Sequence, residues 1–455
     1  MSSIPRNSKN ENHILDFVTN FITEFHISKL LFKCNAGKEK GIPVMDIFRY
    51  LFNLLFSDRS MYMQQKTRVF KEAFSKNTVY RFLNSTRTNW QRFTTLLSAN
   101  IINDFMKPLT SDERKDVFII DDSLFDRSRS KKTELLAKVF DHCSMKYKRG
   151  YRMLTLGWSD GNSFVPINHC LLSAAEDKNL LCEADGYDGR SLAGKRRSQS
   201  RRKATEVMAE LIHSAQKAGI TAKYIVFDSW FSSPKTICAL KNEEHLDVIA
   251  MVKKSSKIKY GYQDKNLNIK EIYSRNKKKR GRSRYLLSVN VTVGEAQIPA
   301  KIVCVRNKSK RKDWLALIST DTSLSEEEII RVYGKRWDIE VFFKSCKSYL
   351  HLVKECTSTS YDALNAHVAI VFTRYMMLSV EQRRNTDDKT ICELCFCLLD
   401  ELDDITFSQS MRIIVDALMN AVMEYFHITE SQLEEFTSNF IQRLPKYMQQ
   451  ALCCA

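Results

Sequence analysis

The chain has 455 residues, of which 44% are hydrophobic and 27% are charged, so it is predicted to be a soluble globular protein with room for several domains. Lys and Arg number 71 against 53 Asp and Glu, a net charge of +18, which favours a polyanionic partner and above all nucleic acid. We expect no secretory signal, because the N-terminus has no apolar region, and no membrane partner, because the longest apolar stretch, His367–Val380, is too short to cross a bilayer.

Residues 1–112 are expected to form a helical N-terminal region that binds DNA. Cations surround the stretch Ser75–Leu83, which is compatible with a helix-turn-helix-like unit that holds DNA. A basic helical bundle without a special DNA contact fits the same pattern equally well. Apolar residues recur at helical spacing in Asn12–Leu31, Pro43–Leu55, Lys66–Phe74 and Ser75–Leu83.

From residue 113 the pattern changes to strands and helices. A short buried strand, Asp116–Ile120, is expected to end at Asp121-Asp122, and the basic segment Ser128–Arg152 is expected to be rich in loops. Two strand-like runs separated by a turn signal then predict an antiparallel meander. The alternation that follows predicts a mixed-sheet α/β core. Its elements are Tyr151–Gly157, Ser163–Leu172, the helix Lys203–Ala218, the strand Ala222–Phe227, the helix Pro234–Glu243 and the strand Asp247–Val252.

Residues 253–313 are expected to interrupt this core as a basic, β-rich insertion. Lys and Arg dominate Ser274–Arg284, and two strand-like runs follow at Tyr285–Val293 and Gln297–Arg306. Charge runs are commonly solvated, but several of them in turns between strands favour a surface for the DNA backbone. The chain returns to the core at the strand Trp314–Ser319.

The core is therefore expected to comprise residues 113–252 and 314–374, and residues 375–455 a helical C-terminal region. Amphipathic helices are predicted at Asp362–Val380, Asp387–Leu402, Ser408–Phe426 and Thr429–Met448.

The stretch Arg331–Leu350, RVYGKRWDIEVFFKSCKSYL, is predicted to continue a single helix that starts at an N-cap, Ser325, with an acidic first turn. At about 100° per residue, one side of this helix is apolar and the other is polar. A lone carboxylate among cations suits a site that ligates a metal ion and grips phosphate, whereas a solvated face is the ordinary alternative. The polar side consists of Tyr333, Arg336, Glu340, Lys344 and Lys347.

Two other carboxylates, Asp121 and Asp228, each follow a buried strand. If they converge with Glu340, the three side chains can bind two hard divalent cations such as Mg²⁺. Such a pair activates a water or a 3′-hydroxyl in a phosphodiester displacement. Because side chains alternate along a strand, only one of Asp121 and Asp122 can face this site.

These motifs resemble those of the insertion-sequence-4 family of DDE transposases. FIIDDS at 118–123 and IVFDSWF at 225–231 are similar to the two Asp strands of that family, and the first favours Asp121 because a Ser stands two positions on. The resemblance extends over roughly residues 114–350. The family's Tyr-x2-Arg-x3-Glu-x6-Lys motif is present, with every spacing kept, as Tyr333, Arg336, Glu340 and Lys347.

The resemblance implies an RNase H-like catalytic core, a mixed sheet with flanking helices and a β-rich insertion, between helical N- and C-terminal regions. It also implies that Asp121, Asp228 and Glu340 are catalytic and ligate two Mg²⁺ or Mn²⁺ ions.

The remaining motif residues would contact DNA. The resemblance implies that Tyr333, Arg336 and Lys347 hold phosphates of the transposon end, and Lys344 is a further cation on the same side of the helix. Trp314 lies where members of the family have a tryptophan near a base flipped out of the duplex. The alternative is that Trp314 is an ordinary strand residue whose side chain faces the protein interior.

The implied function is cut-and-paste DNA transposition: hydrolysis at the ends of an insertion sequence, then attack of the 3′-hydroxyl on target DNA. The implied partners are double-stranded DNA, as terminal inverted repeats and as target, and a second copy of the chain bound through the C-terminal helices. We expect a cytoplasmic, DNA-associated protein. Two alternatives are an inactive or domesticated transposase-derived DNA-binding protein and a metal-dependent DNA nuclease.

Overall fold

The computed structural model describes residues 17–38, 40–55, 75–111, 114–141, 144–279, 283–307 and 313–384. The chain divides into two compact units. The first contains Met1–Glu24, Asn53–Lys71 and Asp388–Ala455, and the second contains Phe25–Phe52 and Glu72–Asp387. The sheet, the helices around it and the candidate site all belong to the second unit.

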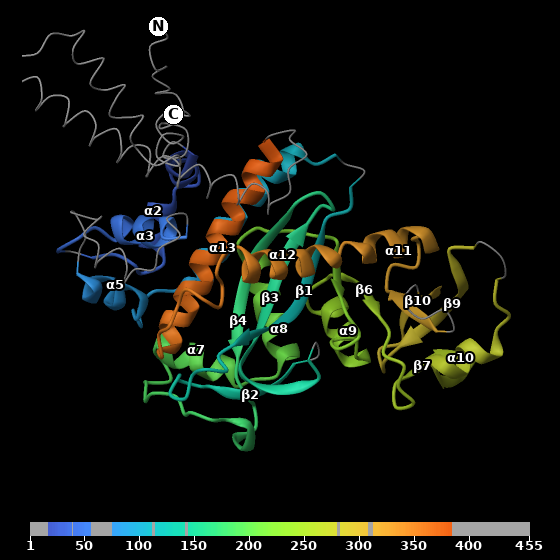
Figure 1. Ribbon diagram of the computed structural model, residues 1–455. Coiled ribbons are helices and arrows are strands. Elements are labelled where there is room, and N and C mark those ends of the chain that lie inside the picture. Colours follow the sequence, from blue (N-terminus) through green and yellow to red (C-terminus); the bar gives the residue numbers. More distant parts are fainter. Residues whose placement is uncertain are drawn as a thin grey trace, which may run out of the picture. The chain divides into compact units, whose positions relative to one another are not determined.

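A mixed sheet of eleven strands, counted over the described residues, forms the centre of this unit (Figure 1). Its order is β2-β3-β1-β5-β6-β11-β10-β9-β7-β8, with β4 paired to β3. Strand β1 is antiparallel to β3 and parallel to β5, which is parallel to β6. The bounds are β1 Val117–Asp126, β2 Ala137–Asp141, β3 Lys146–Ser159, β4 Phe164–Leu172, β5 Tyr224–Phe227, β6 Asp247–Met251, β7 Lys259–Tyr262, β8 Lys265–Asn268, β9 Tyr285–Val293, β10 Ile298–Arg306 and β11 Trp314–Ser319.

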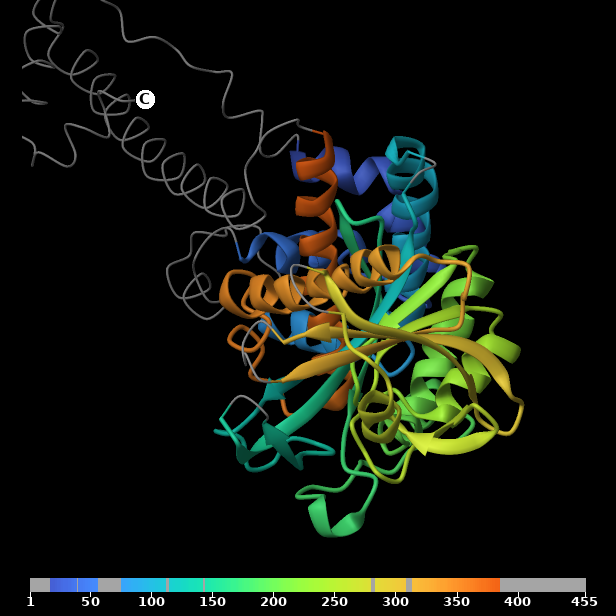
Figure 2. The same cartoon turned by 90° about the vertical axis from the view of Figure 1, so that its right-hand side faces the viewer.

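Helices cover both faces of the sheet. Figures 1 and 2 show α11 and α12 lying across one face, with α8 and α9 against the other. Strands covered on both faces are expected to be continuously apolar, and β5 is buried throughout. The described helices are α2 Ile27–Lys33, α3 Val44–Asn53, α5 Lys76–Leu83, α6 Trp90–Asn100, η1 Ile101–Met106, η2 Lys107–Leu109, η3 Asp177–Asn179, α7 Leu192–Ser200, α8 Ala204–Lys217, α9 Pro234–Asn242, α10 Ile269–Arg275, α11 Glu326–Gly334, α12 Trp337–Ser348 and α13 Tyr361–Arg384.

The predicted fold class, a mixed sheet with flanking helices of the RNase H-like type, is confirmed. The predicted meander is the antiparallel pair β3–β4, and β5, α9, β6 and β11 occupy the ranges that the sequence indicates. Strands β7 to β10 of the insertion extend the same sheet beyond β11. The domain boundaries themselves stay predictions.

Two predictions about the first strand are wrong. Strand β1 does not end at Ile120, because β3 pairs with it along its whole length, from Val117 to Asp126. Asp121 therefore lies inside the strand. The segment Ser128–Arg152 is not mainly loop, since it contains β2 and the start of β3, paired as an antiparallel hairpin.

The predictions for the N-terminal and C-terminal helices have mixed outcomes. The prediction of one continuous helix over Asn12–Leu31 is wrong, because His26 adopts a left-handed conformation (φ 52°) directly before α2. Helices α3 and α5 lie where predicted. The helices predicted at Lys66–Phe74, Asp387–Leu402, Ser408–Phe426 and Thr429–Met448 lie outside the described residues.

Helix α13 is not amphipathic as predicted, because all its residues from Tyr361 to Val380 are buried. By length and composition it resembles a membrane span, but it is enclosed by protein, as the core helix of a soluble protein is. Arg374 on this helix is fully buried and is compensated by Glu355, at 2.6 Å, and by the carbonyl oxygens of Leu51 and Phe52, at 2.6 and 3.0 Å.

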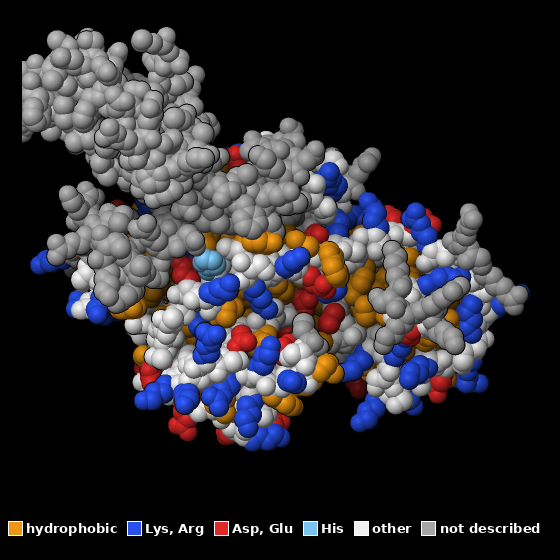
Figure 3. Space-filling model, viewed as in Figure 1, with side chains coloured by type: hydrophobic (Ala, Val, Ile, Leu, Met, Phe, Trp, Pro, Cys, Tyr) orange, Lys and Arg blue, Asp and Glu red, His pale blue; other side chains and the backbone are white. Residues whose placement is uncertain are grey.

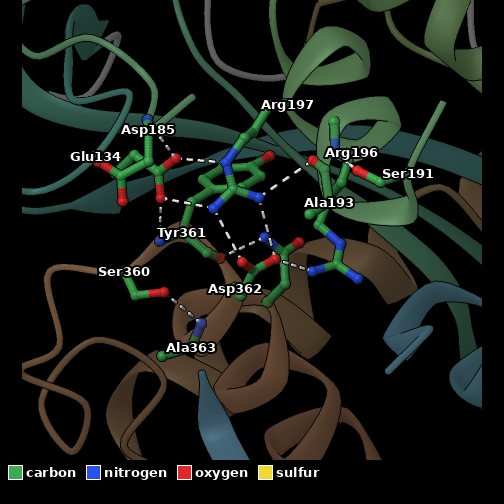
Figure 4. Close-up of polar contacts among 12 residues, drawn as sticks. Glu134, Asp185, Ser191, Ala193, Arg196, Arg197, Ser360, Tyr361, Asp362 and Ala363 are labelled. Carbon is green, nitrogen blue, oxygen red and sulfur yellow. Dashed lines mark hydrogen bonds and ion pairs between the residues drawn. The ribbon is translucent and has the colours of Figure 1, made fainter. Parts of the chain in front are cut away.

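A second group of buried charges joins α7, α13 and the segment between β1 and β2 (Figure 4). Arg197 donates to Glu134, with one bond of 2.9 Å, and to Asp362 at 2.9 Å. Arg196 donates to Asp362 and, at 2.7 Å, to the Thr88 carbonyl. These four charged side chains, Glu134, Arg196, Arg197 and Asp362, form what we call the buried ion cluster. It is charge-balanced and ties three distant parts of the chain together.

Candidate active site

Asp121 and Asp228 lie side by side where the parallel pairing of β1 and β5 ends. The register pairs Val117 with Tyr224 and Ile119 with Val226, and its continuation places Asp121 opposite Asp228. Burial, followed by the charge of Asp228, raises the pKa of the Asp121 carboxyl to about 7, and Arg336 opposes the shift. The structure therefore brings these two predicted carboxylates together.

Asp121 and the adjacent Asp122 point to opposite faces of the sheet, as alternation along a strand requires. The Asp121 Oδ2 atom lies 3.2 Å from Arg336 Nη1 at the start of α12. The Asp122 Oδ1 atom instead accepts a 2.8 Å hydrogen bond from Arg152 Nη2 on β3. Of the two, Asp121 is the one that faces α12.

The predicted continuous helix is wrong, because a turn at Lys335–Arg336 separates α11 from α12. The predicted N-cap is present: Ser325 accepts from the Glu328 backbone, and Glu328 reaches back to complete a capping box. At the turn, the Arg336 N–H bonds the Tyr333 carbonyl at 3.0 Å, a spacing typical of a 3₁₀ turn. The Lys335 ammonium donates to the carbonyls of Lys115 and, at 2.9 Å, Asp160. These bonds fix the turn against the sheet.

The turn places Arg336 between two of the predicted carboxylates. Its guanidinium bonds Asp121 and also Glu340, one turn along α12. Tyr333 also belongs to this group, because its ring lies next to the Arg336 guanidinium. Burial raises the pKa of its phenol to about 12, Arg336 opposes this shift, and the charge of Asp228 adds to it. Tyr333, Arg336, Glu340, Asp121 and Asp228 thus form one cluster.

The other cations of the predicted polar side flank this cluster. Lys347 donates a 2.6 Å hydrogen bond to Ser123, two residues along β1 from Asp121, and Lys344 is exposed. The start of α12 is anchored separately, by a 2.6 Å hydrogen bond from Ser159 to Asp338. Figure 3 shows acidic side chains gathered where α12 crosses the sheet, with Lys and Arg spread around them.

Trp314 contacts residues outside the cluster. Its ring stacks on Tyr273, with centroids 4.1 Å apart and planes 11° apart. The Lys254 ammonium lies 4.3 Å from the centroid of the same ring. The predicted contact of Trp314 with a flipped base stays a prediction.

Trp230 is a residue near the site that reasoning from the sequence missed. Its backbone N–H donates to Asp228 Oδ1 at 2.8 Å, and its side chain is 51% exposed. Arg152 and Lys253 lie 5.0 and 5.4 Å from the centre of its ring. The motif IVFDSWF contains this residue, but only the structure shows that it is exposed beside a candidate ligand.

The three carboxylates Asp121, Asp228 and Glu340 supply only oxygen donors, which is the ligand type that Mg²⁺ and Mn²⁺ prefer. The raised pKa of Asp121, caused in part by Asp228, fits a site where a cation would relieve the repulsion of two acids. In the described part of the chain, no three metal-ligating side chains are already close enough to hold an ion. Arg336, bonded to both Asp121 and Glu340, stands between those acids. The donor set therefore fits the metal, with one oxygen each of Asp121 and Glu340 bonded to Arg336.

Comparison with known proteins gives one family. A family model described as DDE superfamily endonuclease matches residues 46–315, more than half of the chain. The matched region contains Asp121 and Asp228 and ends before α11 and α12. A search of curated proteins gave no match.

Proposed function

The chain belongs to the DDE superfamily endonuclease family, and from this membership we propose that it is a DNA transposase. The proposed reaction is cut-and-paste: hydrolysis at the ends of an insertion sequence, then transfer of the free 3′-hydroxyl into target DNA. Within the family, we propose the insertion-sequence-4 type, because the Tyr-x2-Arg-x3-Glu-x6-Lys motif is intact between Tyr333 and Lys347.

The observation that carries the proposal is the joining of three distant segments. Asp121 comes from β1, Asp228 from the end of β5 and Glu340 from α12, and Arg336 connects the first to the last. A protein that only bound DNA would have no need to keep three carboxylates in a basic surface, because each of them repels phosphate.

We propose that Asp121, Asp228 and Glu340 hold two Mg²⁺ or Mn²⁺ ions. When bound, such ions activate the attacking oxygen and stabilise the leaving oxygen of an in-line displacement. Arg336 has the geometry for a second role, because a guanidinium that binds two carboxylates binds phosphate in the same bidentate way. Tyr333 lies next to Arg336, Lys344 and Lys347 lie further along α12, and these three side chains would hold neighbouring phosphates of the transposon end.

The other parts of the chain receive proposed roles by their composition. We propose that residues 1–112 contact the terminal inverted repeats, that the basic insertion 253–313 follows the DNA backbone, and that residues 375–455 pair two copies of the chain in the synaptic complex. Such a protein would act in the cytoplasm, in association with DNA. A dimer is required because the two ends of one element are cut together.

The test uses the full chain, Mg²⁺ or Mn²⁺, and DNA that carries the inverted repeats flanking the gene. Cleavage at the repeat ends followed by joining to a plasmid is expected for the wild type and not for Glu340→Gln. Asp338→Asn is the matched control, because Asp338 is two residues away on α12 but bonds Ser159 outside the cluster. A wild type that binds the ends without cutting them is a DNA-binding relative, and cutting without joining indicates a nuclease; either result refutes the transposase proposal.

A further inference from the structure

Two contacts attach the break between α11 and α12 to the turn that joins β3 and β4, residues 159–162, which we call the β3–β4 turn. On one side of the break, the Lys335 ammonium donates to the Asp160 carbonyl at 2.9 Å. On the other side, Asp338 accepts a 2.6 Å hydrogen bond from the Ser159 hydroxyl. Because these contacts flank the break, the turn determines where α12 begins relative to the sheet.

The β3–β4 turn is held in shape by contacts that do not involve Lys335. The carboxylate of Asp160 is completely buried, and Lys335 bonds the carbonyl of this residue instead. The carboxylate accepts hydrogen bonds of 2.8–3.0 Å from the backbone of Asn162 and Ser163 and from the side chains of Thr110 and Arg383. A substitution at Lys335 is therefore expected to leave the turn intact.

Gly161 provides the space in which the Lys335 side chain lies. The φ angle of Gly161 is +89°, a conformation that glycine adopts at little cost. A Cβ atom at this position would lie 2.9 Å from Cε and 3.2 Å from Nζ of Lys335. The lysine chain therefore lies directly against the backbone of the turn, and a side chain at residue 161 would displace it.

The same ammonium connects the break to the strand of Asp121. Lys335 also donates to the carbonyl of Lys115, which lies two residues before β1. The Lys115 ammonium in turn bonds Glu328 at 2.7 Å, in the capping box at the start of α11. Helix α11 is thus attached at both ends to the segment that leads into β1, so the position of the break is set relative to Asp121.

An ammonium group is a costly way to fill this space. Burial lowers the pKa of Lys335, although the charges of Asp160 and Asp338 oppose the shift. An apolar side chain of the same length would occupy the space without the desolvation of a charge. What the ammonium adds is direction, because its hydrogen bonds to two fixed carbonyls allow one placement of the helix end.

We propose that Lys335 is a positioning residue for Arg336. Held by the two carbonyls, the Lys335 ammonium fixes the start of α12 at the place from which the Arg336 guanidinium reaches Asp121. Glu340 follows one turn later on the same helix, bonded to the same guanidinium. The inference rests on the proposed function for the catalytic use of this arrangement, but not for the arrangement itself.

The experiment measures the coupling between Arg336 and Asp121 in the full chain, by chemical denaturation in EDTA at pH 8, where Asp121 is ionised. Arg336→Met, Asp121→Asn and the double variant give the coupling as the departure of their effects from additivity. The effects should not be additive in the wild type, because the two side chains are 3.2 Å apart. In a Lys335→Met background they should become additive.

A pair of glycine variants makes the test specific. Gly161→Ala displaces Lys335 by a second route and should also remove the coupling. Gly41→Ala is the matched control, because Gly41 has the same φ of +89°, yet no described atom lies within 4 Å of the Cβ that alanine would add. It should leave the coupling unchanged. The proposal is overturned if the coupling persists in Lys335→Met, or if the two glycine variants change it equally. Should Lys335→Met fail to fold, the glycine pair decides.

Cleavage of end-labelled DNA in Mg²⁺ forms a separate arm. Lys335→Met is expected to reduce cleavage by up to about 100-fold, the loss that follows when a catalytic group is misplaced by about 1 Å, whereas Gly41→Ala should cut as the wild type does. A wild type that does not cut DNA refutes the proposed function alone, because the coupling is measured without metal or DNA and still decides whether Lys335 positions Arg336.

Discussion

The buried ion cluster and the candidate active site use the same chemistry, carboxylates bonded to arginine, but they differ in balance and exposure. Glu134, Arg196, Arg197 and Asp362 supply two charges of each sign, and their side chains are 1–5% exposed. The active site has three carboxylates and one bonded arginine, Arg336, which pairs with Asp121 and Glu340; these two acids are 17% and 36% exposed.

The difference indicates what each group is for. A closed and balanced set of buried charges fixes segments relative to one another, and the loss of one member leaves a charge without compensation. In a group near the surface with more negative than positive charges, the protein does not neutralise every carboxylate, so the group favours binding of a cation from solution. Removing a charge should therefore destabilise the first group and should relieve the second.

The largest effect on stability is expected for Asp362→Asn. It leaves Arg196 and Arg197 with Glu134 as the remaining acid of the cluster, and breaking a buried pair in this way costs about 3–5 kcal/mol of unfolding free energy. Chemical denaturation of the two proteins measures the difference. Asp177→Asn is the control, because Asp177 pairs with Arg201 at 94% exposure, where little change is expected. Equal effects of the two substitutions would remove the distinction drawn between the cluster and a surface pair.

Glu340→Gln should act mainly on activity and hardly on stability, in contrast to Asp362→Asn. We expect cleavage in Mg²⁺ to fall by more than about 100-fold, the upper value for side chains that merely orient metal ligands. The unfolding free energy should change little, since Arg336 keeps its bond to Asp121. Strand cleavage of end-labelled DNA and a denaturation curve on the same preparation measure both. A variant that lost its stability together with its activity would show that Glu340 is structural.

Asp121→Asn tests the excess charge directly. The folded pKa of Asp121 is raised from 3.8 to about 7, so folded protein binds the proton more tightly than unfolded protein. This contribution to stability is complete below about pH 4 and is lost as pH rises to about 7. The asparagine variant without metal should equal the wild type at about pH 4 and exceed it by roughly 1–3 kcal/mol at pH 8. Thermal melting in EDTA across this range measures the gain, and a variant that is less stable at pH 8 would contradict it.

Lys344→Ala should give the smallest effect. Lys344 is exposed on α12, so its loss should leave stability unchanged and reduce the salt dependence of DNA binding by about one counterion. Lys217→Ala is the matched control, because this exposed lysine ends α8 on the opposite face of the sheet. Binding titrations at several salt concentrations compare the two. An equal reduction by both would mean that DNA is not held preferentially at α12.

Parts of the fold and the site could be predicted because their signals are local. Apolar runs such as Tyr224–Phe227 and Trp314–Ser319 identify strands without any knowledge of their neighbours. The capping box of Ser325 and Glu328 is likewise set by four adjacent residues. The extension of β1 to Asp126 could not be predicted, because it depends on pairing with β3.

The buried ion cluster shows the limit most clearly. Arg196 and Arg197 occur in the basic run KRRSQSRRK, and nothing in that run separates them from the solvated cations around them. Their burial depends on Glu134 and Asp362, which are distant in the chain. The turn at Lys335–Arg336 could not be predicted for the same reason, because the carbonyls that bind Lys335 belong to other segments of the chain.

The sequence by itself determined which residues are available: a basic chain, a polar group of side chains around Glu340 and two acids that follow apolar runs. These follow from composition and periodicity, which each segment carries alone. The motif already favoured Asp121 over Asp122, and the tertiary structure shows that Asp121 faces α12. Only the tertiary structure decided that Arg336 bridges Asp121 and Glu340 and that Trp230 is exposed beside Asp228. The reason is physical: the direction of a side chain, its solvation and its partners depend on strand register and helix packing, which join residues far apart in the chain.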